Sequence, residues 1–235
     1  MIALPVAATE CRQETFENLS FSICEVDLTQ ERLQLFLYDT SGEPFGHFSA
    51  LEQALDEKGL ALGFAMNAGM YHEDRSPVGY YVEQGKELQG VISAEGPGNF
   101  GLLPNGVLCL REGRADVFET GALLEAAPEC RYATQSGPML VIDGALHPRF
   151  LADGTSRFIR NGVGTTEDGT RAVFAISDTA VNFHTFARFF RDHLGLLNAL
   201  YLDGNVSRLR APELGRDDAG FTDLGPIIGV VKPAS

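Results

Sequence analysis

Apolar and polar residues alternate along two early segments of the chain. Residues 19–28 (LSFSICEVDL) alternate roughly, and residues 32–39 (RLQLFLYD) place Leu33, Leu35 and Leu37 on one face. A period of two residues is typical of a half-buried β-strand. Both segments therefore predict strands.

A helical pattern follows these strands at residues 49–59. Ser49 predicts the N-cap, and Gly59 predicts the end of the helix. The apolar run at residues 60–66 (LALGFAM) then suits a strand that is covered on both faces. Together with the preceding strand, these segments predict a first strand-helix-strand unit.

The last third of the chain repeats this order, and the middle predicts hairpins. Residues 171–177 and 198–202 predict strands, and residues 182–194 between them predict an amphipathic helix. Residues that favour turns stand at Gly85, at 104–106, at Asp143 and Gly144, and at Asp168 and Gly169. The turn at 104–106 predicts a hairpin whose strands are residues 100–103 and 107–111. The pattern predicts an α/β (α+β-like) fold: one domain with a mixed, strand-rich sheet, two strand-helix-strand units and several hairpins.

The chain has 235 residues and ordinary globular composition. We expect residues 1–18 to be an N-terminal segment, in part the remnant of a signal peptide, and residues 19–235 to be the domain. A formal net charge of -14 would repel a phosphate backbone, so nucleic acid is excluded as a partner. Apolar runs such as 139–142 are too short to span a membrane.

The four cysteines lack the spacing of a zinc site, and the histidines form no metal-spaced set, so we expect no metal. Phosphate-loop and dinucleotide motifs are missing too, so we expect no cofactor. Three disulfide pairings are possible, and Cys11 to Cys24 with Cys109 to Cys130 closes the shortest loops. Disulfides would indicate an oxidising compartment, so the expected location is periplasmic or secreted.

Polar residues stand where the predicted strands end. If the strands of each unit are parallel, their carboxyl ends open on one edge, where ligands tend to bind. Asn67, Asp178 and Asp203 would share this rim. Two simpler interpretations stay open: Asp178 as the N-cap of the following helix, and Asp203 with Gly204 as an ordinary turn.

Two further segments contain candidate anion donors. Ser136 and Gly137 precede a strand, where backbone N–H groups could form a small anion-binding nest. Arg160 stands at the head of a glycine-rich strand and could bind a phosphate through both arms of its guanidinium.

Four short motifs occur in one order: MNAGMY at 66–71, QSGPML at 135–140, RNGVGTT at 160–166 and YLDGNVS at 201–207. This set resembles the phosphodiester glycosidase family, in particular its exported bacterial branch. The positions that match the family's motifs are Asn67, Gly69, Ser136, Gly137, Pro138, Arg160, Gly164, Asp203, Gly204 and Ser207. Ala68, Asn205 and Val206 stand where the family has glycine, which makes the loop after Asp203 bulkier.

The resemblance implies hydrolysis of a glycosyl-1-phosphodiester, with a sugar-phosphate or glycan as substrate. Asp203 would act on the sugar side with Asp178 as its partner, and Arg160, Asn67 and the Ser136–Gly137 backbone would hold the phosphate. A non-catalytic glycan-binding or envelope-interaction protein of the same fold is the alternative, since the altered glycine loop could have lost turnover. An ordinary glycosidase with a neutral leaving group fits Arg160 less well.

Overall fold

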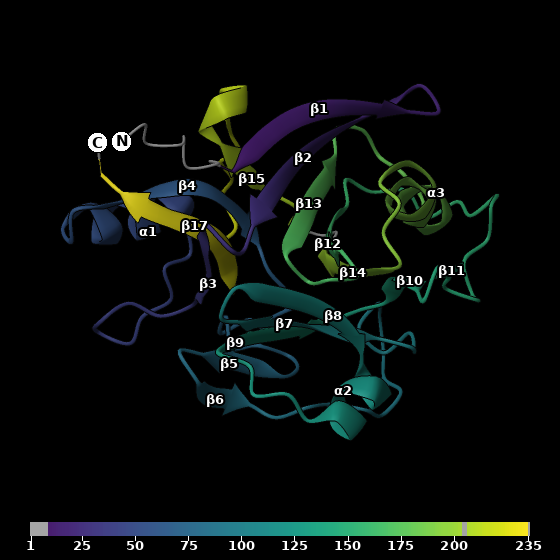
Figure 1. Cartoon of the computed structure of the whole chain (residues 1–235), viewed down its shortest axis with the longest axis horizontal. Helices are drawn as coiled ribbons and strands as arrows, with labels where there is room; N and C mark the ends of the chain where they lie inside the picture. The colour runs from purple at the N-terminus through teal and green to yellow at the C-terminus, as the bar shows by residue number, and fades with distance from the viewer. Residues whose placement is uncertain (1–8, 204–205, 235) are drawn as a thin grey trace.

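The computed structural model describes residues 9–203 and 206–234, which fold into three β-sheets with few helices (Figure 1). The seven-stranded sheet contains, in spatial order, β1 (Glu10–Phe16), β2 (Leu19–Asp27), β13 (Arg171–Ser177), β12 (Asn161–Thr165), β14 (Asn198–Asp203), β10 (Met139–Ile142) and β11 (Ala145–Leu146). One five-stranded sheet contains β16 (Arg216–Asp217), β15 (Leu209–Ala211), β4 (Leu60–Asn67), β17 (Ile227–Pro233) and β3 (Arg32–Phe36). The other contains β6 (Lys86–Gln89), β5 (Tyr81–Glu83), β9 (Tyr132–Ser136), β7 (Gly106–Arg111) and β8 (Arg114–Glu119).

Short helices cover the outer sides of these sheets. They are α1 (Phe48–Asp56), α2 (Thr120–Ala126) and α3 (Phe183–Arg188), which continues as the π-helical turn η1 (Phe189–His193); a 3-10 turn, η2 (Pro212–Leu214), follows β15. Figure 1 shows α1 beside β4 and β17, α2 beside β7 and β8, and α3 near β10. The strand-rich α/β single-domain fold is confirmed, with its strands divided among three sheets.

Every strand pairing within the described ranges is antiparallel, yet the two strands of each predicted unit run in the same direction. Asn161 at the start of β12 pairs with Ile176 of β13 on one side and with Asp203 of β14 on the other. Because β13 and β14 are both antiparallel to β12, they are parallel to each other. The strands β3 and β4 flank β17 in the same way, so one antiparallel strand separates the two members of each unit.

The predicted helix at 182–194 is present, and it packs on the seven-stranded sheet. Asn182 caps it by accepting a hydrogen bond from the Thr185 N–H at 2.8 Å. Its buried aromatic residues are Phe186, Phe189 and Phe190. A Cβ at Gly164 of β12 would lie 2.7 Å from Leu196 Cδ1, so this glycine lets the helical layer approach the sheet.

Two sequence expectations are wrong in detail. The first helix begins at Phe48, and its N-cap is His47 without a side-chain bond, so Ser49 is already inside the helix. Residues 100–103 form turns, because Asn105 Nδ2 donates to the Phe100 carbonyl at 3.1 Å and folds this segment back on itself. The strand that follows, β7, pairs instead with β8 and β9.

The structure contains both disulfides of the shortest-loop pairing, Cys11–Cys24 and Cys109–Cys130. The first joins directly opposed residues of β1 and β2. The strand β1 lies within the segment set apart as 1–18, and its residues 10–16 belong to the large sheet; residues 1–8 lie outside the described residues.

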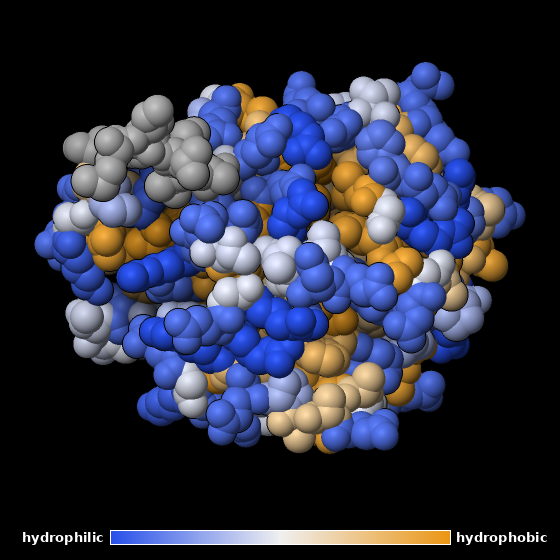
Figure 2. Space-filling view, viewed as in Figure 1, coloured by the Kyte–Doolittle hydropathy of each residue, from blue (hydrophilic) through white to orange (hydrophobic). Residues whose placement is uncertain are grey.

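Figure 2 shows one face on which hydrophilic residues predominate and hydrophobic residues form separate patches. Among the described residues, no helix is long and apolar enough to cross a membrane.

Candidate active site

The strand β14 ends at Asp203, where the chain passes from the seven-stranded sheet to a five-stranded one. The next strand, β15, pairs with β4 in the second sheet, with Leu209 opposite Met66. Asp203 is therefore placed next to the end of β4, which is Asn67. Asp203 is 8% exposed and Asn67 is fully buried.

The side chain of Asn161 ties these strand ends together. Its Nδ2 donates to the backbone carbonyl of Asn67 at 3.0 Å and to Asn67 Oδ1 at 3.1 Å. Its Oδ1 accepts from the Asp203 N–H at 3.0 Å. Two of the three rim residues that the sequence predicted are thus brought together by a third side chain that it did not single out.

Ser207 closes the loop that leaves β14. Its hydroxyl donates to the backbone carbonyl of Asp203 at 2.6 Å and lies 3.1 Å from the carbonyl of Ile159. Gly204, the other predicted member of this loop, lies outside the described residues.

Two tyrosine side chains lie within electrostatic reach of Asp203. Burial raises the pKa of Tyr71, Asp203 raises it further, and Arg75 and Arg208 oppose the shift. Burial also raises the pKa of Tyr201, with Arg160 opposing and Asp203 adding to the shift. Both phenols are therefore neutral at pH 7. The Tyr71 hydroxyl donates to the Asp223 carbonyl at 3.1 Å, whereas the Tyr201 hydroxyl accepts from Arg160 Nη1 and has its own proton to donate.

Arg160 is fully buried, and the protein itself occupies most of its donors. Its Nε donates to the Val181 carbonyl at 2.9 Å, Nη2 to the Ser156 carbonyl at 3.0 Å and Nη1 to the Tyr201 hydroxyl at 3.2 Å. The guanidinium carbon lies 3.6 Å from the centre of the Phe183 ring. Burial lowers the pKa of Arg160, and this geometry makes it a support for Tyr201.

Asp178 is not brought together with Asp203, because β12 separates the strands that carry them. One oxygen of Asp178 accepts from the Ser20 hydroxyl at 2.6 Å, and the other from the Ser22 hydroxyl at 3.0 Å and from Arg216 Nη1 at 2.6 Å. Nor does Asp178 cap the helix, since Asn182 does. Its carboxylate is held in an ion pair away from the rim.

Ser136 and Gly137 support β14 from the neighbouring sheet. The hydroxyl of Ser136 donates to the carbonyl of Leu202 at 2.7 Å, one residue before Asp203. A Cβ at Gly137 would lie 2.7 Å from Asn105 Cβ, so the close packing here needs glycine.

Four residues around Asp203 were not predicted: Tyr71, Asn161, Tyr201 and Arg208. Each lies inside one of the four motifs or directly after it. Asn161 carried a usable signal, because a polar residue opens a strand that is otherwise buried along its length. The burial of Arg208 depends on a loop distant in sequence and had no such signal.

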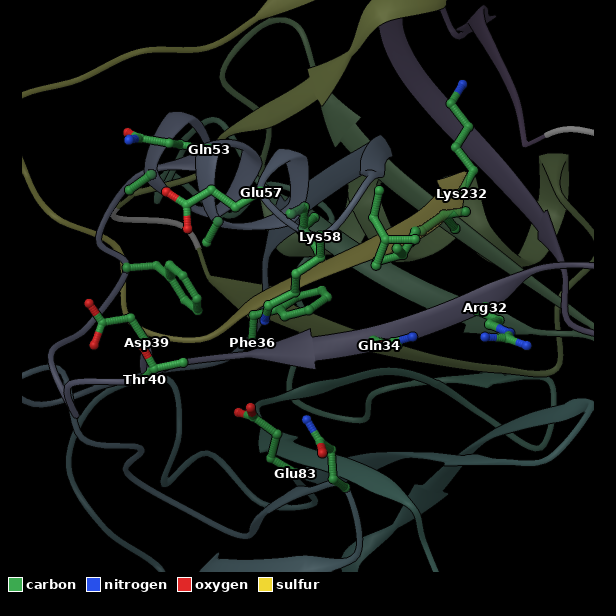
Figure 3. Close-up of a pocket in the computed structure, with 18 of the residues that line it drawn as sticks. Arg32, Gln34, Phe36, Asp39, Thr40, Gln53, Glu57, Lys58, Glu83 and Lys232 are labelled. Carbon is green, nitrogen blue, oxygen red and sulfur yellow. The ribbon is translucent and has the colours of Figure 1, made fainter. Parts of the chain in front are cut away.

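A cavity of about 1010 Å³ opens elsewhere, between β3, α1 and the β5–β6 hairpin (Figure 3). Arg32, Gln34 and Phe36 of β3 line it, with residues of α1 on the opposite wall. Glu83 also lines it, and burial raises the pKa of this carboxyl group. None of the candidate site residues lines this cavity, so we locate the candidate chemistry at the end of β14.

Within the described part of the chain, no group of three or more acidic, histidine or cysteine side chains could hold a metal ion. The described residues place at the rim the Asp203 carboxylate, the phenols of Tyr71 and Tyr201, amides and guanidinium groups, and Asp223 also acts on the Tyr71 phenol.

Comparison with known proteins shows what the chain is similar to. A family model described as phosphodiester glycosidase matches residues 62–213. The uncharacterized protein YigE of Escherichia coli (strain K12) is 34% identical over 204 residues, which are 87% of this chain and 79% of that protein.

Two solved structures share the fold. The zebrafish N-acetylglucosamine-1-phosphodiester alpha-N-acetylglucosaminidase catalytic domain, auto-inhibited by its pro-peptide, matches with a TM-score of 0.65 and 14% identity over 98% of this chain and 85% of that one. A hypothetical protein from Synechocystis matches with a TM-score of 0.61 and 14% identity over 94% of this chain and 61% of that one.

Proposed function

Because the chain belongs to the phosphodiester glycosidase family, we propose that it is a hydrolase that cleaves a glycosyl-1-phosphodiester bond in an exported glycan or glycolipid. The observation that carries this proposal is the placement of Asp203. Asp203 is nearly buried, and Asn161 accepts from its backbone N–H and so holds it next to Asn67. Its carboxylate lies within electrostatic reach of Tyr71 and Tyr201. The name of the zebrafish enzyme supports a sugar-1-phosphodiester as the class of substrate.

In the proposed reaction, water adds to the anomeric carbon as the bond from that carbon to the phosphate oxygen breaks. The bonding electrons leave with the phosphate, so the products are a sugar and a phosphomonoester. One proton of the water goes to a base and then to solvent. Because a phosphomonoester leaves readily, the main demand on the protein is to stabilise positive charge on the sugar and negative charge on the phosphate.

We assign Asp203 to the sugar side, as nucleophile, base or electrostatic stabiliser. The neutral phenol of Tyr201 would donate a hydrogen bond to a substrate oxygen, and Arg160 would act indirectly by orienting Tyr201. The Tyr71 hydroxyl already donates to the Asp223 carbonyl, so we assign Tyr71 a place in the wall of the site. We assign Asp178 a structural role, because serine hydroxyls and an arginine already hold its carboxylate.

The test is incubation with a panel of sugar-1-phosphodiesters, measuring released reducing sugar and phosphomonoester together. Release of both from the same substrate is expected. Asp203→Asn should lower kcat by about 10²- to 10³-fold at an unchanged melting temperature, because a charge is removed at nearly constant shape. Asp178→Asn is the matched control and should keep turnover, and full activity in Asp203→Asn would refute the assignment.

A non-catalytic glycan-binding or envelope-interaction protein is the second candidate. The observation that favours it is the replacement of family glycines by Ala68, Asn205 and Val206 in the two motifs that contain Asn67 and Asp203. Saturable binding of a sugar-1-phosphodiester without release of either product would support this alternative.

We also propose a periplasmic or secreted location. Its support is the pair of disulfides, which persist in oxidising compartments. Four free thiols in protein isolated from its native compartment, detected by mass spectrometry after alkylation, would contradict it.

A further inference from the structure

Arg208 is a largely buried cation that forms no ion pair in the described part of the chain. It is 8% exposed and lies in the segment that joins β14 to β15. Its backbone N–H donates to Asn67 Oδ1 at 2.8 Å, but no hydrogen bond or ion pair of its guanidinium occurs within residues 9–203 and 206–234. A buried guanidinium is costly unless an acceptor or an anion meets it.

Two other arginines, Arg210 and Arg160, have acceptors for their side-chain donors. Arg210, two residues further along, pairs with Glu52 and Asp217. Arg160 donates to neutral acceptors through all three of its side-chain nitrogens. Arg210 lacks an acceptor only at Nε. Arg208 differs from both, because none of its side-chain nitrogens has an acceptor among the described residues.

A second unsatisfied donor lies next to Arg208. Asn67 is fully buried, and its Nδ2 has no hydrogen-bond partner among the described residues. The orientation of this amide is fixed, since Oδ1 accepts from both Asn161 Nδ2 and the Arg208 N–H. The unsatisfied donor is therefore the NH₂ group, at the residue that contacts the Arg208 backbone.

Two glycines let the segment 220–225 approach Arg208 and Tyr71 closely. A Cβ at Gly220 would lie 2.1 Å from Arg208 Nη2, and a Cβ at Gly225 would lie 2.5 Å from Tyr71 Cγ. The Tyr71 hydroxyl donates to the Asp223 carbonyl at 3.1 Å, which holds the loop at 220–225 against the site. Arg208 lowers and Asp203 raises the pKa of the same Tyr71 phenol, so both groups lie within its electrostatic reach.

We propose that the Arg208 guanidinium and Asn67 Nδ2 form an anion subsite beside Asp203 that binds the phosphate of a phosphodiester. This assignment rests on the proposed function for the identity of the anion, and it gives the phosphate-binding role to Arg208 in place of Arg160. One cation and one amide suit the single negative charge of a diester. A phosphomonoester approaches two charges at pH 7 and meets the nearby Asp203, so the subsite favours the substrate over the product.

The test measures anion binding directly, so that it does not depend on turnover. Dimethyl phosphate is titrated into the full-length protein and followed by ³¹P NMR, with methyl phosphate as the monoester comparison. Saturable binding of the diester, tighter than that of the monoester, is expected for the wild type. Arg208→Gln should weaken diester binding by roughly 10- to 100-fold, and Arg208→Lys should weaken it less.

Arg210→Gln is the matched control. It removes the same charge two residues further along the chain, from a side chain that already pairs with Glu52 and Asp217. It should bind dimethyl phosphate as the wild type does, and melting temperatures report whether each variant is folded. Absence of saturable binding in the wild type, or wild-type affinity in Arg208→Gln, overturns the subsite.

Failure of the subsite and failure of the proposed function give different results. Loss of binding in Arg208→Gln supports the subsite even where no sugar phosphodiester is hydrolysed. Where hydrolysis occurs, Arg208→Gln should raise KM for the phosphodiester by about the factor by which it weakens dimethyl phosphate binding. Hydrolysis with wild-type KM and wild-type anion affinity in that variant would leave the function standing and the subsite refuted.

Discussion

Gly69 lies between Asn67 and Tyr71 and has a backbone φ of +100°. A Cβ at this position would stand 2.5 Å from Thr134 Oγ1, whose hydroxyl donates to the Ala68 carbonyl at 3.0 Å. We predict that Gly69→Ala lowers the free energy of unfolding by about 2 to 4 kcal/mol, measured by urea denaturation, because positive φ and a steric clash add. It should also lower turnover by displacing its neighbours at the rim.

Gly42→Ala separates the two causes. Gly42 has a similar φ of +89°, but a Cβ added there would meet nothing within 4 Å. Its substitution should cost only about 1 kcal/mol. Equal losses of unfolding free energy in the two variants would show that Thr134 moves away without cost. The positive φ would then account for the whole loss.

At the scale of residues, the sequence predicted which residues lie at the rim better than it predicted what their side chains contact. Asn67 and Asp203 were predicted to share a rim because both end apolar strands, and they do share it through Asn161. Arg160 was predicted to reach a phosphate, but its sequence neighbours could not reveal that Val181 and Tyr201 occupy its donors. Burial of a charged side chain depends on residues that are distant in the chain.

At the scale of elements, the β7–β8 hairpin carries a charge cluster that can be tested by pH. Although burial raises the pKa of Asp116, hydrogen bonds from Arg114 and Arg111 outweigh it and hold this pKa below its ordinary value. A depressed folded-state pKa contributes stability that is present above the unfolded pKa, about 3.9, and is lost as pH falls through the folded value.

We therefore predict that Asp116→Asn lowers the free energy of unfolding by about 1 kcal/mol at pH 7. The difference from the wild type should shrink below pH 4 and vanish once Asp116 is protonated in the folded state. Urea denaturation at pH 7, 4 and 3 measures this. A difference that stays constant across these pH values would mean that the substitution disturbs packing and that the charge of Asp116 adds no stability.

Elements with a strong local pattern were predicted and are present. The alternation in β2, the apolar run in β4 and the aromatic stripe of α3 each reflect burial of the element's own residues. The failure at residues 100–103 has a different origin, since the apolar run there is folded into turns by the Asn105 side chain. Hydrophobicity reports that a segment is buried but not which hydrogen bonds its backbone makes.

At the scale of the molecule, a single α/β domain was predicted, but the division into three sheets was not. The pairing of β2 with β13 brings Cys24 opposite Phe174, and the pairing of β4 with β17 brings Asn67 opposite Ile227. Such long-range registers leave no mark on local periodicity. The site depends on these long-range pairings, because Asp203 ends a strand of one sheet while Asn67 ends a strand of another.

The two disulfides are the covalent constraints on this arrangement, and their loss tests how far the sheets stabilise themselves. They close loops with sequence separations of 13 and 21 residues, for which chain entropy gives about 3 kcal/mol each. Cys11→Ser/Cys24→Ser and Cys109→Ser/Cys130→Ser should each lower the melting temperature by several degrees, measured by calorimetry without reductant. Reductant should lower the melting temperature of the wild type further than either double substitution does, and it should leave the quadruple serine variant unaffected. Mass spectrometry confirms that the reductant has produced four free thiols. If the wild-type melting temperature is then unchanged, either the bonded loops are already ordered in the unfolded chain or the bridges add no stability.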